Sequence, residues 1–173
     1  MLKRDQLRRS LTGDLFALYD CVLGELQRRK IIRSKNNPCA DYAELLVVRA
    51  LGLEVAGKST KGYDAKDADG KRYEIKSRRI TPENGSRQLG FIRDLNKESQ
   101  PFDYLVGVLF NSDFSVFRAC LIPVETVLEL ATYREREKVW RLLLVDETWG
   151  RSEIRDLTES IRAAASELSD TSK

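Results

Sequence analysis

Histidine is absent from the 173 residues of this chain, and only three cysteines are present. Histidine is the usual general base of enzymes and the commonest transition-metal ligand. Its absence therefore excludes Ser-His-Asp and Cys-His hydrolases, histidine-based nucleases, zincins and facial-triad iron enzymes. Catalysis here would have to use carboxylates, lysine, tyrosine or serine, and a metal would be a hard cation bound through oxygen.

Cys21, Cys39 and Cys120 are widely spaced, and none belongs to a CxxC pair. This arrangement argues against a disulfide framework or a zinc cluster and suits a protein of the reducing cytoplasm. The chain also lacks an apolar run near the ~20 residues that cross a bilayer, and its charged start lacks the apolar core of a secretory signal. We therefore expect a cytoplasmic protein with no membrane partner.

The net charge is only +3, but the charge is unevenly distributed along the chain. Residues 58–97 carry 11 Lys and Arg against 6 Asp and Glu, whereas residues 121–173 carry 8 against 11. A basic middle segment indicates a surface that meets an anion such as nucleic acid. A solvated surface explains the same composition equally well.

Apolar spacing predicts one long amphipathic helix over residues 3–29, appended to a single domain that begins at residue 31 and extends to residue 173. The residues that recur at three- and four-residue spacing are Leu7, Leu11, Leu15, Leu18, Val22 and Leu26. Further helices are expected over 38–50, 123–131 and 152–168, with a short one near 91–97, and Ser152 is a candidate cap. Strands are expected over 53–56, 63–67, 72–77, 102–110 and 114–122, while 139–145 fits a strand or a helix. This order predicts an α+β or α/β/α sandwich.

Two carboxylates and a lysine gather in one predicted hairpin. Its turn, residues 68–70, is a three-residue loop that ends in glycine, which is a common hairpin connection. The register set by this turn places Asp64 opposite Glu74, and Lys76 follows two residues later on the same face. Like charges in this position are unfavourable unless a cation lies between them. Mg²⁺, with Mn²⁺ as a substitute, typically takes one or two protein carboxylates and keeps waters and phosphate oxygens as its other ligands.

Asp64, a gap of nine residues, and then Glu74-Ile75-Lys76 resemble the Asp…(Asp/Glu)-x-Lys core of the PD-(D/E)xK, or restriction-endonuclease-like, nucleases. Glu44 lies in the preceding helix, where that family often carries a further acid, and Tyr63 stands where it often carries proline. The resemblance covers about residues 38–130 and implies an α/β (α+β) fold with a mixed central β-sheet flanked by helices. It also implies a Mg²⁺-dependent endonuclease. In that role Asp64 and Glu74 would hold the metal, Lys76 would position the attacking water, and Glu44 would support or complete the metal site.

Basic residues flank these acids and are candidates for contacting nucleic acid, for which DNA is the expected form. Phosphate contacts fix affinity and position without reading sequence, whereas Gln88 is a candidate for reading base edges. Taken one by one, the basic residues are ordinary surface charges. The candidate set consists of Lys58, Lys61, Arg78, Arg79, Arg87 and Gln88.

Three functions therefore remain open from the sequence. The first is a metal-dependent nuclease, and the second is a catalytically silent nucleic-acid-binding or interaction module of the same fold. The third is a subunit that pairs through the helix over 3–29, whose apolar stripe could also pack on its own domain or form a homodimer.

Overall fold

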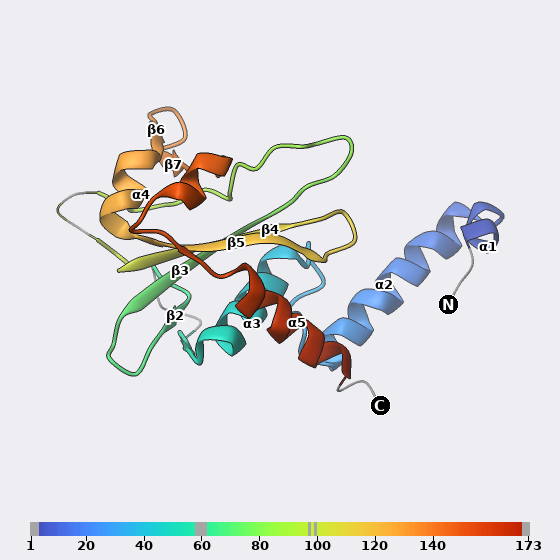
Figure 1. Cartoon of the computed structure of the whole chain (residues 1–173). Helices are drawn as coiled ribbons and strands as arrows, with labels where there is room; N and C mark the ends of the chain where they lie inside the picture. Colours follow the sequence, from blue (N-terminus) through green and yellow to red (C-terminus); the bar gives the residue numbers. More distant parts are fainter. Residues whose placement is uncertain (1–3, 58–61, 97, 99, 171–173) are drawn as a thin grey trace.

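The structure is a computed structural model that describes residues 4–57, 62–96, 98 and 100–170. In chain order its elements are α1 (Arg4–Arg8), α2 (Thr12–Arg28), α3 (Cys39–Leu51), β1 (Glu54–Val55), β2 (Ala65–Lys66), β3 (Arg72–Arg79), β4 (Tyr104–Phe110), β5 (Val116–Pro123), α4 (Val124–Leu130), β6 (Thr132–Arg134), β7 (Val139–Arg141), η1 (Asp146–Gly150), β8 (Arg155–Asp156) and α5 (Thr158–Asp170). Figure 1 shows α3 and α5 on one face of the central sheet, and α4 with the β6–β7 hairpin on the other. Helices α1 and α2 project away from this body.

Six strands form the central sheet in the order β1-β2-β3-β4-β5-β8. Strands β3 and β4 are parallel, whereas the other neighbouring pairs are antiparallel. The sheet is therefore mixed but mostly antiparallel, which confirms the mixed α/β class. A parallel pair requires a long crossing connection, and the buried Leu89 and Ile92 of this connection pack on the face opposite α3 and α5.

Strands β4 and β5 are buried along most of their length, as continuous apolar runs predict for central strands. Alternate residues of β4 serve different cores. Val106 and Val108 pack with α3 and α5, whereas Leu105 and Leu109 pack with the crossing connection and α4. The sheet thus separates two hydrophobic cores, and each is closed by its own layer.

Helix α3 begins and ends where the sequence predicts. Pro38 is its N-cap residue, and Gly52 ends it in the left-handed backbone conformation, with φ 64° and ψ 37°. Ala43, Leu46 and Val47 are fully buried against the sheet. The start of the hairpin that follows is therefore fixed relative to a well-packed helix.

The prediction of one continuous helix over residues 3–29 is wrong. Within the described residues, α1 ends at Arg8 and α2 begins at Thr12, because Leu11 has extended backbone with φ −67° and ψ 152°. The hydroxyl of Ser10 bonds back to the carbonyl of Gln6 at 3.1 Å, a local contact that competes with helix continuation. Apolar periodicity passes through this break without interruption, so the pattern alone did not reveal it.

The C-terminal helix also starts later than predicted, and Ser152 does not cap it. Residues 155–156 pair with β5 as strand β8, and α5 begins at Thr158. Asp156 Oδ1 accepts the amide of Thr158 at 2.8 Å, so this acid satisfies the first turn.

The segment near 91–97 is not a short helix in its described residues. Ile92 instead exchanges two backbone hydrogen bonds with Trp140 of β7, and Leu89 donates to the carbonyl of Leu142. The same contacts resolve the open interpretation of 139–145, whose first residues form strand β7. The three cysteines are free. In the described part of the chain, no helix is long and apolar enough to cross a membrane.

Gly107 of β4 is a position where a side chain would not fit. A Cβ atom there would lie 2.9 Å from Leu144 Cδ1 and 3.1 Å from Leu89 Cδ1. We therefore expect Gly107→Ala to lower the free energy of unfolding by about 1–3 kcal/mol, as overpacking usually does, when measured by urea denaturation. The control is Gly85→Ala, where a Cβ would meet nothing within 4 Å. Equal midpoints for the two variants would contradict the close packing of this core.

Candidate active site

The β2–β3 hairpin has the register that its turn predicts. Ala65 lies opposite Tyr73, so the next pair outward is Asp64 and Glu74. Gly70 takes the left-handed backbone conformation, with φ 79°, that the end of such a turn requires. The hairpin therefore places both acids opposite one another on adjacent segments.

Backbone hydrogen bonds fix Asp64 from two sides. Its carbonyl accepts the amide of Ala56 at 2.9 Å, and its own amide donates to the carbonyl of Tyr73 at 2.8 Å. Its carboxylate Oδ2 accepts the amide of Ile75 at 2.7 Å. Asp64 lies just before the first residue of β2, so here a side chain and not the backbone of β2 pairs with β3. The carboxylate is thereby anchored beside β3, next to Glu74.

Glu74 and Lys76 occupy the face of β3 that looks away from α3. Their neighbour Ile75 packs into the core under α3, so strict alternation directs the two charged side chains to the other face. The ammonium group of Lys76 forms an ion pair with Glu74 Oε1, and the two side chains are only 22% and 12% exposed. The crossing connection passes beside the lysine stem, since a Cβ on Gly90 would lie 3.6 Å from Lys76 Cδ.

Glu44 projects from α3 and is paired with Arg33. Arg33 belongs to the connector before α3, and that connector is held by Asp41, whose Oδ2 accepts the amides of Arg33 at 2.7 Å and Ser34 at 3.1 Å. The guanidinium of Arg33 is therefore positioned by its own backbone, and Glu44 has a fixed cation partner.

The charges of Asp64 and Lys76 both act on the carboxyls of Glu44 and Glu74. Burial raises the pKa of the Glu44 and Glu74 carboxyls to about 7 in each case, and the negative charge of Asp64 adds to the shift of both. A hydrogen bond with Asp64 raises the pKa of Glu74 further, whereas Lys76 lowers both pKa values and Arg33 lowers that of Glu44. The raised pKa values of the two glutamates therefore come first from burial, with the charge of Asp64 opposing ionisation and the neighbouring cations favouring it.

Asp64 and Glu74 are the two carboxylates of this site that could hold a magnesium ion. Mg²⁺ prefers oxygen donors and is commonly held by one or two carboxylates, with waters and substrate phosphate in its other positions. Among the residues that the structure describes, no three Asp, Glu or Cys side chains are grouped closely enough to form a protein cage for a metal. The arrangement therefore offers an open site with two carboxylates, and Glu44 stays with Arg33.

Of the predicted nucleic-acid contacts, Arg78 is the one on the same strand face as Glu74 and Lys76, two residues beyond the lysine. Its Nε is buried and has no hydrogen-bond partner among the described residues. Lys58 and Lys61 lie outside the described residues.

Arg79 is not brought to the carboxylates. Arg79 points to the opposite face of β3, where its guanidinium lies 4.5 Å from the centroid of the Phe114 ring and its Nε donates to the carbonyl of Ser112 at 3.0 Å. Gln88 forms an isolated backbone bridge with Leu143 at the edge of the crossing connection. Arg79 therefore does not face the acid pair, although it is close to it in sequence.

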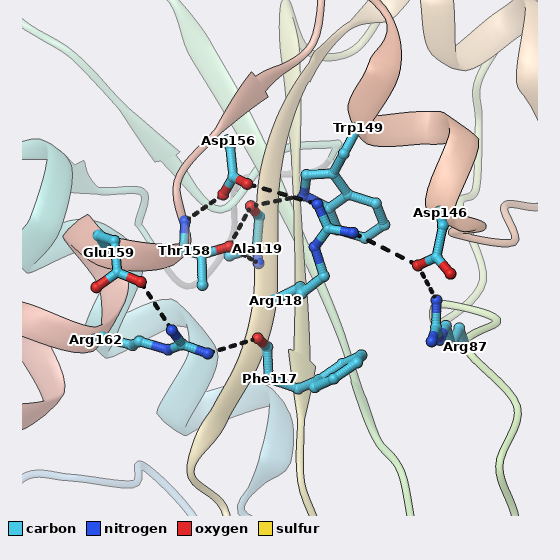
Figure 2. A network of polar contacts seen from close by, with 10 residues as sticks. All are labelled: Arg87, Phe117, Arg118, Ala119, Asp146, Trp149, Asp156, Thr158, Glu159 and Arg162. Atoms are coloured by element: carbon cyan, nitrogen blue, oxygen red, sulfur yellow. Dashed lines mark hydrogen bonds and ion pairs between the residues drawn. The ribbon is translucent and has the colours of Figure 1, made fainter.

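Arg87 belongs to an ion-pair network on β5 (Figure 2). Its Nη1 lies 2.6 Å from Asp146 Oδ1, and its guanidinium lies over the ring of Phe117 at 5.2 Å. Arg118 shares Asp146 at 3.5 Å and lies over the ring of Trp149 at 3.8 Å. The network ties the segment between β3 and β4, and η1, to β5. Arg87 therefore has a structural role, and it lies two strands away from β3.

Sequence reasoning missed two residues of the site. Arg33 carries no signal in the sequence, because it and Glu44 lie in different elements and meet only through the turn before α3. Gly90 interrupts an apolar segment between Leu89 and Phe91, and a glycine in that setting is a recognisable sign of close backbone approach.

Comparison with known proteins finds no protein-family model and no curated protein that matches this chain. The function therefore has to be argued from the site.

Proposed function

We propose that this protein is a metal-dependent nuclease with a restriction-endonuclease-like core that hydrolyses phosphodiester bonds in DNA. The observation that carries the proposal is the pair of neighbouring carboxyls, Asp64 and Glu74, beside the ammonium group of Lys76. Burial raises the pKa of Glu74 to about 7, so keeping this acid next to another is unfavourable unless a cation compensates the charge. The mixed sheet, with helix α3 ahead of the acidic hairpin, supports the same family resemblance.

In this proposal Asp64 and Glu74 hold Mg²⁺. The bound ion polarises the phosphoryl oxygen and lowers the pKa of the attacking water. Asp64 is suited to be the fixed ligand, because three hydrogen bonds hold its backbone and carboxylate in place. Glu74 would be the second ligand, and its carboxylate is paired with the ammonium group of Lys76.

Lys76 lies beside the two acids, paired with Glu74. Its ammonium group would donate a hydrogen bond that orients the attacking water and stabilises negative charge as it develops on the phosphate oxygens. Gly90 lies beside the lysine stem, where an added Cβ would make an ordinary van der Waals contact with Lys76 Cδ. Glu44 acts from α3 through its charge, and Arg33 keeps that carboxylate in place.

A catalytically silent nucleic-acid-binding or interaction module of the same fold is the second candidate. It is favoured by the cations that already neutralise the acids, since Lys76 pairs with Glu74 and Arg33 pairs with Glu44. In that case Arg78, on the same strand face as the acids, would bind phosphate without metal, and affinity would fall steeply as salt is raised.

Cleavage and binding of the same DNA distinguish these two functions. We expect the purified chain to convert supercoiled plasmid to nicked and linear forms in Mg²⁺ or Mn²⁺, and to leave it intact in EDTA. Fluorescence anisotropy with a labelled duplex measures binding in parallel. Salt-sensitive binding without cleavage in either ion would overturn the nuclease and support the silent module, whereas the absence of both would overturn both.

A further inference from the structure

A small cavity lies between the β6–β7 hairpin and the crossing connection from β3 to β4. Its volume is about 320 Å³, which is at the lower end of the range for sites that bind small ligands. The hairpin covers the face of the sheet opposite α3 (Figure 1), and Glu74 and Lys76 point to that same face. The residues that line the cavity are Asp94, Leu95, Asn96, Tyr133, Lys138 and Trp140.

Two aromatic rings contribute to the lining of this cavity. Tyr133 of β6 lies opposite Trp140 of β7, and their ring centroids are 5.2 Å apart with a tilt of 52°. The indole of Trp140 is held in place, because its Nε1 donates to the carbonyl of Leu95 at 2.6 Å. Tyr133 remains 40% exposed. A fixed aromatic surface that is open to solvent is suited to stacking with another flat ring.

The cavity also carries two opposite charges that do not pair with each other. Asp94 and Lys138 both line it, yet neither side chain has an ion pair or a hydrogen bond among the described residues. Both residues take the left-handed backbone conformation, with φ 57° and 51°, which is uncommon outside glycine and recurs at binding sites. A ligand with both a hydrogen-bond donor and an anionic group would satisfy the two charges at once.

The hairpin that carries Lys138 is basic on its exposed surface. Residues 134–141 hold four cations and two acids. Arg141 pairs with Glu137 at 3.2 Å, whereas Arg134, Arg136 and Lys138 are exposed and have no ion pair within the described part of the chain. Exposed cations around an aromatic surface are typical of proteins that hold single-stranded nucleic acid, because the cations contact the phosphates and the rings stack on the bases.

The crossing connection leads from the acidic site to this cavity. Gly90 lies beside the stem of Lys76, and Asp94 follows four residues later. Four residues span at most about 14 Å. The cavity is therefore within a few nucleotides of a phosphate held at Asp64 and Glu74.

We propose that this cavity binds one unpaired base of the DNA strand, stacked against Tyr133 and Trp140. Asp94 accepts a hydrogen bond from an amino group of the base, and Lys138 contacts a phosphate of the same strand. A base has to leave its duplex, or belong to a single strand, to stack in this way. The inference rests on the proposed function for the identity of the polymer, and it adds that single-stranded or locally unpaired DNA is the preferred form.

Asp94 also predicts which base is preferred. The amino group of cytosine donates to a carboxylate, whereas thymine presents a carbonyl oxygen at the same position, which a carboxylate repels. The two bases have rings of the same size, so stacking alone would not separate them. We therefore expect a labelled oligo-dC to bind more tightly than an oligo-dT of equal length, and a duplex of that length to bind more weakly than either.

Fluorescence anisotropy in EDTA measures this binding separately from cleavage. Tyr133→Ala should raise the dissociation constant for oligo-dC at least about fivefold, which is the lower end of the loss of one base–aromatic stack. Tyr133→Phe keeps the ring and should bind as the wild type does. Tyr19→Ala is the matched control, because it removes a tyrosine that is 54% exposed on α2, and it should leave binding unchanged.

A second variant tests base preference, which a merely structural role would not change. Asp94→Asn tolerates the left-handed backbone, and its amide can bond to either base. The ratio of the oligo-dT to the oligo-dC dissociation constant should therefore fall toward one. Asp69→Asn, in the exposed turn of the β2–β3 hairpin, removes the same charge and should keep the wild-type ratio.

The outcomes separate the cavity from the nuclease. If Tyr133→Ala bound oligo-dC as tightly as the wild type, or Asp94→Asn kept the wild-type ratio, the base site would be overturned, and plasmid cleavage through Asp64 and Lys76 would be unaffected. Binding of oligo-dC that depends on Tyr133 and Asp94, in a chain that cleaves no plasmid, would support the base site and contradict the nuclease. Circular dichroism checks that each variant is folded.

Discussion

Asp64→Asn and Lys76→Met are each expected to reduce the rate of Mg²⁺-dependent plasmid cleavage at least about 100-fold. This is the lower end of the rate loss that usually follows removal of a positioned catalytic group. The amide oxygen of Asn can still accept the hydrogen bond from Ile75, so Asp64→Asn removes the charge and leaves the hairpin in place. Lys76→Met keeps the stem beside Gly90 and removes only the ammonium group. The loss should therefore appear in cleavage rate, with DNA affinity changed less than about threefold.

Matched controls come from the same hairpin. Asp69→Asn changes an exposed acid of the turn, and Lys66→Met changes a strand lysine that pairs with Glu54 at 3.2 Å. Each control removes the same charge as its test variant and lies in the same hairpin, and both should cleave at the wild-type rate. If the controls lost as much activity as Asp64→Asn and Lys76→Met, general charge and not the acid–lysine constellation would explain the cleavage.

Without divalent metal, the free energy of unfolding should fall as the pH rises from about 4.5 to about 7. Glu44 and Glu74 have folded-state pKa values raised to about 7 from the ordinary value of 4.5. A raised folded-state pKa means that the folded chain binds the proton more tightly than the unfolded chain does. The stabilisation is therefore complete below pH 4.5 and is lost as each carboxyl ionises through pH 7. Thermal unfolding in EDTA across this range measures the slope.

Magnesium should reverse this loss at pH 8. Saturation at about one hundred times its dissociation constant stabilises the folded state by about 2.7 kcal/mol, which raises Tm by roughly 5–10 °C in a chain of this size. Asp64→Asn should abolish the response to Mg²⁺. In EDTA at pH 8 the same variant should be more stable than the wild type, because it removes a charge that raises the pKa of both glutamates. An Asp64→Asn chain that still gains the full Tm increase from Mg²⁺ would place the ion elsewhere.

Local chemistry explains why the acidic hairpin could be predicted. A three-residue turn that ends in glycine fixes the register by itself, and alternation then fixes the face of each β3 residue. Asp64 and Glu74 therefore had to meet whatever the rest of the chain did. The continuity of the N-terminal helix was predicted wrongly for the opposite reason, because apolar spacing is equally regular on both sides of the break at Leu11.

Contacts between distant segments account for what the sequence did not reveal. Arg87 is only nine residues from Arg78, yet the crossing connection carries it across β4 to Asp146 and Phe117. Arg33 meets Glu44 because Asp41 folds the connector back onto α3. Neither pairing leaves a periodic trace, since each depends on where an irregular segment lies on the finished sheet.

The amino-acid sequence alone limited the candidate catalytic groups, since the chain has no histidine and gathers Asp, Glu and Lys in one hairpin. It also determined the hairpin register and the central strands, because short-range turn geometry and continuous apolar runs act within a few residues. Tertiary structure decided which basic residues stay near the acids and how far burial raises the pKa values of Glu44 and Glu74. It also decided that the apolar side chains of α2 are exposed. Those properties are set by packing between segments that are far apart in the chain.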